Sequence, residues 1–282
     1  LAELDTLITR RDDELAAAAR NYQPLLDQLD RRDRVGTQAA AAINEALASN
    51  PPEVARRFLD QVWRQVLLQV GNEHGPDSPQ WQEHASAIDG LLWSFHPKTA
   101  GDDRKALAQR LPLILKTLKS GMERIELPIP AQETYLDDFF MLQREALRAA
   151  PVATTAADPD AEIPATGLPG SSGQVLAGEV RSGQLTLATL DYADVEPPPS
   201  RAAAYAAGDW LSFMMPDGKA RLGQVGLISR RILLINPDAG LAIAIHPAIL
   251  DRQLREGDAS IRSGFSLFER AATRALRKNG QA

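Results

Sequence analysis

Residues 201–282 alternate short strand-like segments with turn residues and then end in a helical pattern. Asp217-Gly218 and Asp238-Ala-Gly240 supply turn residues between segments of strand length. The segment SLFERAATRALRKN follows, in which Ser266 and Glu269 form a capping-box pattern and apolar residues recur at helical spacing. This order of elements predicts a small antiparallel β-barrel with a C-terminal helix.

Residues 1–150 show helical periodicity throughout. Asn50-Pro-Pro-Glu53 and Ser78-Pro79 each combine a capping residue with proline in the first turn, which is typical of helix starts. A helix that begins near Asp102 contains Pro112, which is expected to kink it or divide it in two. Further helical segments precede these: 2–20, 24–33 and 37–49. The sequence therefore predicts an α+β protein whose first domain is an all-helical bundle.

Residues 151–200 differ in composition from both flanks. Pro, Gly, Ala, Ser, Thr and acidic residues dominate, and Pro197-Pro-Pro199 closes the stretch, as is typical of a linker. Within it, QVLAGEV and QLTLATL flank Arg-Ser-Gly, a pattern that fits a hairpin over residues 174–190. The sequence leaves open whether this hairpin adds two strands to the barrel or the whole stretch is linker.

Composition narrows the functional classes. The chain of 282 residues carries a net charge of −6, whereas residues 201–282 carry 12 Lys and Arg against 7 Asp and Glu. This excess is compatible with a phosphorylated ligand but is too mild to favour nucleic acid. The absence of cysteine excludes disulfides and thiol chemistry, and no apolar run is long enough to span a bilayer. We expect a cytoplasmic protein without a membrane span.

No set of catalytic residues emerges from the sequence. His74 and His84 lie near acidic residues, but the ten residues between them fit no compact ligand spacing, and we interpret both as surface residues. The chain has no phosphate-binding glycine loop and no nucleophile elbow. The sequence therefore predicts no enzyme, no metal site and no cofactor.

Several motifs together resemble a known family: FLDQVWRQVLLQVGNEHGPDSPQW, LLWSFHPK, LPLILKTLKSGM, GDWLSF, LISRRILLINPDAG and LFERA. It is a proteobacterial family of unknown function, whose members are sometimes labelled thymidine phosphorylase and whose C-terminal region is PilZ-like. The resemblance covers residues 50–150 and 200–280. The phosphorylase label has no support in the residues, because nothing looks like a phosphate-binding loop or a nucleoside pocket.

The PilZ-like resemblance implies a domain that binds cyclic di-GMP or signals through protein contact. In such receptors, an Arg-x-x-x-Arg segment before the barrel and an Asp/Asn-x-Ser-x-x-Gly motif on the strands hold the dinucleotide. Here the first motif aligns with Arg201-Ala-Ala-Ala-Tyr205, which keeps one arginine. The second aligns with Leu227-Ile-Ser229-Arg-Arg-Ile232, which keeps only the serine, so the domain looks like a degenerate PilZ-like domain. If a nucleotide binds, the residues expected to line its site are Arg201, Tyr205, Ser229, Arg230 and Arg231.

These observations favour a non-enzymatic signalling adaptor or receptor. Its expected mode of action is contact with a partner protein, and cyclic di-GMP is a second class of ligand. Two alternatives remain: a purely structural scaffolding protein with no small-molecule ligand, and an enzyme whose catalytic residues precede Leu1 in a longer chain. Whether Arg201 and Arg230 face a common groove discriminates between a receptor and a scaffold.

Overall fold

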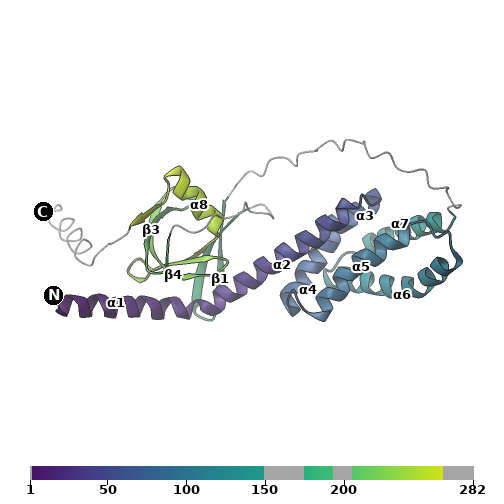
Figure 1. Ribbon diagram of the computed structural model, residues 1–282. Helices are drawn as coiled ribbons and strands as arrows, with labels where there is room; N and C mark the ends of the chain where they lie inside the picture. The colour runs from purple at the N-terminus through teal and green to yellow at the C-terminus, as the bar shows by residue number, and fades with distance from the viewer. Residues whose placement is uncertain (1, 149–174, 193–204, 263–282) are drawn as a thin grey trace. The chain divides into compact units, whose positions relative to one another are not determined.

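The computed structural model describes residues 2–148, 175–192 and 205–262, and it combines helices with a sheet (Figure 1). The helical elements are α1 (Ala2–Asn21), α2 (Gln23–Ala48), α3 (Glu53–Phe58), the π-helical turn η1 (Leu59–Trp63), α4 (Arg64–His74), α5 (Pro79–Phe95), α6 (Gly101–Arg124), α7 (Ile129–Arg148), the 3-10 turn η2 (Pro237–Ala239) and α8 (Pro247–Glu256). The strands are β1 (Val175–Ser182), β2 (Leu185–Tyr192), β3 (Trp210–Met214), β4 (Ala220–Ile228), β5 (Ile232–Asn236), β6 (Leu241–Ile245) and β7 (Ser260–Arg262). The predicted α+β class is confirmed.

The chain forms two compact units, and the boundary between them falls within α2. The helical unit comprises residues 31–166, and the sheet unit comprises residues 1–30 together with 167–282. The sequence analysis instead grouped residues 1–150 as one helical domain. The difference arises because Leu15 and Ala19 of α1 are buried in the same hydrophobic cluster as side chains of the sheet.

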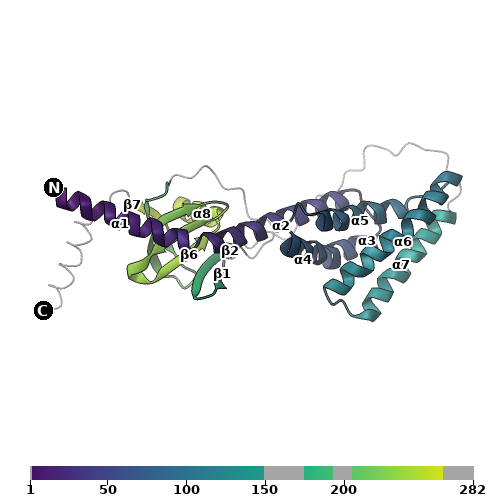
Figure 2. The same cartoon turned by 90° about the horizontal axis from the view of Figure 1, so that it is seen from below.

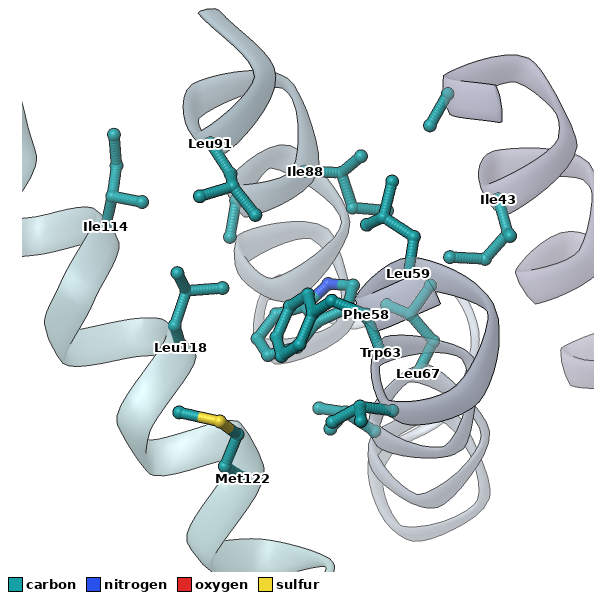
Figure 3. Close-up of a cluster of buried hydrophobic side chains, with 14 of the residues drawn as sticks. Ile43, Phe58, Leu59, Trp63, Leu67, Ile88, Leu91, Ile114, Leu118 and Met122 are labelled. Atoms are coloured by element: carbon teal, nitrogen blue, oxygen red, sulfur yellow. The ribbon is translucent and has the colours of Figure 1, made fainter. Parts of the chain in front are cut away.

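An aromatic cluster forms the centre of the helical unit (Figure 3). The ring of Phe58 stacks on Trp63 with centroids 5.6 Å apart and meets Phe139 of α7 edge-on at 5.0 Å. Gly121 lets α6 approach this cluster closely, because a Cβ atom there would lie only 2.7 Å from the Trp63 ring. A glycine within a predicted helix is therefore a packing residue in the core.

The sequence predicted the start of a helix correctly at Ser78, but it predicted interruptions that the structure does not have. Ser78 caps α5, since its Oγ accepts a hydrogen bond from the Trp81 amide at 3.1 Å. Gly36 lies inside an uninterrupted α2, where two helical segments were predicted. A glycine in a helix interior lowers the stability of the helix by only about 1 kcal/mol relative to alanine. The neighbouring Val35 is fully buried, and its packing offsets that loss. Pro112 likewise lies within a single helix, α6, on its exposed side.

Within the described residues, the sheet has seven strands in the order β1-β2-β6-β5-β4-β3-β7. The predicted hairpin at residues 174–190 is present, because β1 and β2 pair in antiparallel register from Val175–Tyr192 to Ser182–Leu185. Its second strand then pairs in parallel with β6. The sheet is therefore mixed, and it does not close, since β1 and β7 lie at its opposite edges. The prediction of a closed antiparallel barrel was wrong.

Both faces of the sheet's central strands are covered, which explains why the sheet need not close to bury its apolar side chains. On one face, α1 and the first turns of α2 contact a cluster that includes Leu233 and Ile235, and Figure 2 shows α1 running across the strands. On the other face, Ile249 and Leu250 of α8 pack with Leu234. All five residues of β5 are consequently buried, as expected for a strand between two layers.

Helix α8 was not predicted, although its ends carry recognisable signals. His246 caps the first turn, with its Nδ1 accepting from the Ala248 amide at 3.2 Å, and Pro247 occupies the first helical position. Gly257 ends the helix in the left-handed conformation, with φ of 85°. The helix predicted over residues 266–279 lies outside the described residues. Among the described helices, none combines the length and the apolar composition needed to cross a bilayer.

Candidate functional site

The residues predicted to hold a nucleotide lie in separate environments. Arg201 is outside the described residues. Tyr205 is 6% exposed and belongs to the cluster that includes Ile249 and Leu250 of α8. Burial raises the pKa of the Tyr205 hydroxyl, and the charge of Asp251 raises it further. Tyr205 is therefore part of the sheet unit's core, where its ring cannot stack on a ligand without opening that core.

The three predicted residues between β4 and β5 have different roles. The Arg231 guanidinium is 2% exposed and pairs with Asp191 of β2 across 2.5 Å. The Ser229 hydroxyl donates to Oδ1 of Asp30 in α2 at 3.1 Å. Arg230 is exposed and forms no ion pair with any described residue. Arg231 thus connects the β4–β5 turn to β2, and Ser229 connects the same turn to α2. Two of the three predicted side chains therefore have structural partners within the sheet unit.

The helical unit carries a groove between α2 and α5. It has a volume of about 620 Å³ and is open on one side. Small side chains keep it hollow, because Ala42 and Ala46 of α2 face Ala85 and Ser86 of α5. Its remaining apolar lining comes from the following α5 residues: Trp81, Ile88 and Leu92. The groove thus exposes part of an otherwise continuous hydrophobic core.

The polar groups of this groove are few and distinctive. Glu45 and Asp89 lie on its rim, are exposed, and form no ion pair with any described residue. The indole N–H of Trp81 is shielded from solvent and has no acceptor in the described part of the chain. Indole N–H groups usually find a hydrogen-bond partner when they are buried. The groove therefore offers an apolar surface and two negative charges.

A second hollow of about 540 Å³ lies between α4 and the end of α6. It is lined mainly by polar side chains, including Gln65, Gln69 and Asn72. Its one cation, Arg124, is already paired with Glu73. An anionic ligand would have to compete with that carboxylate, so this hollow is a weaker candidate than the α2/α5 groove.

Two buried polar residues of the helical unit have structural partners. Lys98 donates from Nζ to the carbonyl oxygens of Trp93 and His96, both at 2.7 Å, and so completes the end of α5. Desolvation lowers the pKa of this ammonium group. His84 is 6% exposed rather than on the surface as interpreted from the sequence, and its ring stacks on Trp63. In the described residues, no three His, Asp or Glu side chains gather as metal ligands would.

Comparison with known families gives one partial match, to the helical region that contains the α2/α5 groove. Residues 26–139 match a family described as "Protein of unknown function (DUF1631) third domain". No curated protein and no solved structure matches the chain. The match assigns no activity, and it includes no strand of the sheet, so the PilZ-like character of the sheet unit stays a prediction.

The groove was not among the predicted sites, although its elements were in the sequence. The Ala-rich segment over residues 37–49 was interpreted as a weakly apolar helix. Its alanines recur at helical spacing, at Ala39, Ala42 and Ala46, opposite a helix with large apolar residues. A stripe of small residues that packs against large ones indicates either close helix contact or a hollow, and only the structure distinguishes the two.

Proposed function

We propose that this protein is a non-enzymatic adaptor whose helical unit binds an amphipathic helix of a partner protein in the α2/α5 groove. The observation that carries this proposal is the combination of an open apolar lining with two rim carboxylates that form no ion pair with any described residue. Adaptors commonly recognise an amphipathic helix by laying its apolar face into such a groove.

The chemistry of the groove specifies what kind of helix fits. Ile88 and Leu92 of the lining receive apolar side chains, and each large side chain that is fully buried contributes about 1.5–3 kcal/mol. Glu45 and Asp89 favour lysine or arginine on the flank of the bound helix, which raises the association rate and selects against acidic partners.

Binding of a synthetic helical peptide to the full chain tests this proposal. The probe has leucines along one face and arginines along the other, and its twin carries glutamate in place of every arginine. We expect the arginine peptide to bind at least about tenfold more tightly than the twin at low salt, with the difference shrinking as salt increases. Fluorescence anisotropy of the labelled peptides measures both affinities.

Charge reversal on the rim identifies the site. The double variant Glu45→Lys and Asp89→Lys should invert the preference between the two peptides, because both positions are exposed and neither supports the core. A matched control is Glu53→Lys on α3, which is exposed and does not line the groove. Equal binding of both peptides, or an unchanged preference in the rim variant, would point instead to a scaffold that does not use this groove.

A further inference from the structure

Exposed and half-buried apolar side chains follow a line along one face of α7. Ile129, Phe140 and Leu147 are 69%, 61% and 39% exposed, respectively. Together with the half-buried Leu136, they are separated by seven, four and seven residues, which places all four on one face of the helix. Single exposed apolar residues are ordinary, but a contiguous apolar patch marks an interaction site.

Two opposite charges flank this line. Glu133 and Arg144 lie on the same side of it, and neither forms an ion pair with any described residue. The Nε atom of Arg144 is moreover shielded from solvent without an acceptor among the described groups. The charge of Arg144 is therefore not balanced by an acidic side chain within the described part of the chain.

We propose that this face of α7 binds the same face of a second copy of the chain, with the two helices antiparallel. A two-fold axis at the level of Asp138 places Ile129 opposite the partner's Leu147, and Leu136 opposite the partner's Phe140. The same axis brings Glu133 beside the partner's Arg144. Every contact occurs twice, as an isologous interface requires.

The alternative arrangement of two copies is less complementary. Parallel α7 helices related by a two-fold axis would place Glu133 and the partner's Glu133 at the same level but on opposite sides of the line, and the two Arg144 side chains likewise, so no acidic side chain would meet a basic one. The antiparallel register alone brings each of these acidic side chains beside a basic one, and opposite charges across an interface favour association. The charge pattern therefore selects one orientation as well as one partner.

The mass of the full chain in solution, measured over a range of concentrations, tests the pairing. Sedimentation equilibrium should show a reversible dimer, and Phe140→Glu should weaken it at least about tenfold. The matched control is Leu113→Glu on α6, which is 67% exposed and lies outside the line, and it should leave the dimer unchanged. A monomer at every concentration, or equal loss in the two variants, would overturn the proposal.

Exchanging the charges of Glu133 and Arg144 tests the register of the two α7 helices, and the double variant controls for effects of the single variants on folding. Glu133→Arg alone and Arg144→Glu alone should each weaken the dimer, because each creates a like-charge contact. The double variant should restore it, since the pair is then reversed but complementary. If the double variant does not recover the dimer affinity of the wild type, Glu133 does not contact the partner's Arg144.

Cross-linking tests the orientation. The chain has no cysteine, so Ile129→Cys and Leu147→Cys each introduce a single thiol. Residues 129 and 147 are about 27 Å apart along the helix, so neither variant should form a disulfide with itself in an antiparallel pair. A mixture of the two variants should cross-link under mild oxidation. Cross-linking within either variant alone, or none in the mixture, would contradict the antiparallel arrangement.

Discussion

Arg231 and Asp191 form an ion pair between the start of β5 and the end of β2, with Nη2 of the arginine 2.5 Å from Oδ1 of the aspartate. Strand β6 lies between those two strands in the sheet. The Arg231 side chain is only 2% exposed, so the pair is largely removed from water on the arginine side. It fixes the β1–β2 hairpin to the rest of the sheet at a position where the sequence predicted a ligand contact.

We expect Arg231→Ala to lower the free energy of unfolding of the sheet unit by about 2 kcal/mol. The substitution removes the Arg231–Asp191 ion pair, and the partial exposure of Asp191 reduces the penalty relative to a fully buried pair. Arg230→Ala, the adjacent exposed position, is the control and should change stability by less than about 0.5 kcal/mol. Urea unfolding measures both. Wild-type stability in Arg231→Ala, combined with loss of cyclic di-GMP binding, would assign the residue to a ligand site instead.

Alkaline pH should destabilise the sheet unit through Tyr205. The pKa of its hydroxyl is raised by burial and by Asp251, so above about pH 10 the unfolded chain loses this proton while the folded chain keeps it. The free energy of unfolding then falls as pH rises. In Tyr205→Phe this part of the decline should be absent when unfolding is compared at about pH 9 and about pH 11. An identical decline in both proteins would show that Tyr205 does not keep its proton.

Lys98 should have the opposite effect on the helical unit. Desolvation lowers the pKa of its ammonium group below 10.5, so between that lowered pKa and 10.5 the unfolded chain binds more protons than the folded chain. The free energy of unfolding therefore rises with pH in this window. Lys98→Met should remove the rise, which unfolding of the two proteins across the window can measure. A rise of the same size in the variant would assign it to other groups.

Glycines of the helical unit should respond oppositely to substitution by alanine. At Gly121 a Cβ atom would lie within 3.0 Å of both the Trp63 ring and Val66, so Gly121→Ala should destabilise the unit by about 1–3 kcal/mol. At Gly36 nothing lies within 4 Å of that position, so Gly36→Ala should stabilise α2 by about 0.5–1 kcal/mol. Thermal unfolding distinguishes the two signs. A neutral Gly121→Ala would show that α6 and the aromatic cluster can move apart.

Local signals predicted the elements of this fold well. Ser78 with Pro79 marked the start of α5, and the turn at Arg-Ser-Gly marked the β1–β2 hairpin, because capping and turn chemistry act between residues close in the sequence. Long-range pairing was not predictable in the same way. The parallel contact between β2 and β6 joins residues more than fifty positions apart, and nothing local in either strand specifies it.

The closed barrel was predicted because the helix that covers one face of the sheet was assigned to another domain. Leu15, Ala19 and Leu29 form an apolar stripe, but a stripe does not indicate which surface it will meet. The run Ile232-Leu-Leu-Ile235 carried a usable signal, since an uninterrupted apolar strand is typical of a sheet covered on both faces. Together, these two observations predict an open sheet with helices on both of its faces.

The predicted site residues show a similar limit. Residue type indicated that Arg231 and Tyr205 could contact a phosphate or a base, but their burial decides what they do in this fold. The α2/α5 groove exists because the side chains that face each other across the two helices, such as Ala42 and Ala85, are too small to fill the space between them. No single residue marks such a feature in a sequence.

Binding of the arginine peptide to Ser86→Arg, compared with Gln80→Arg, tests the central claim most directly. Both positions are exposed on α5, but only Ser86 lines the groove, so the two variants add the same charge inside and outside it. The account predicts that Ser86→Arg weakens binding at least about tenfold, by filling the groove and repelling the peptide, while Gln80→Arg binds as the wild type does. Equal affinity of the two variants would contradict the assignment of the groove as the binding site.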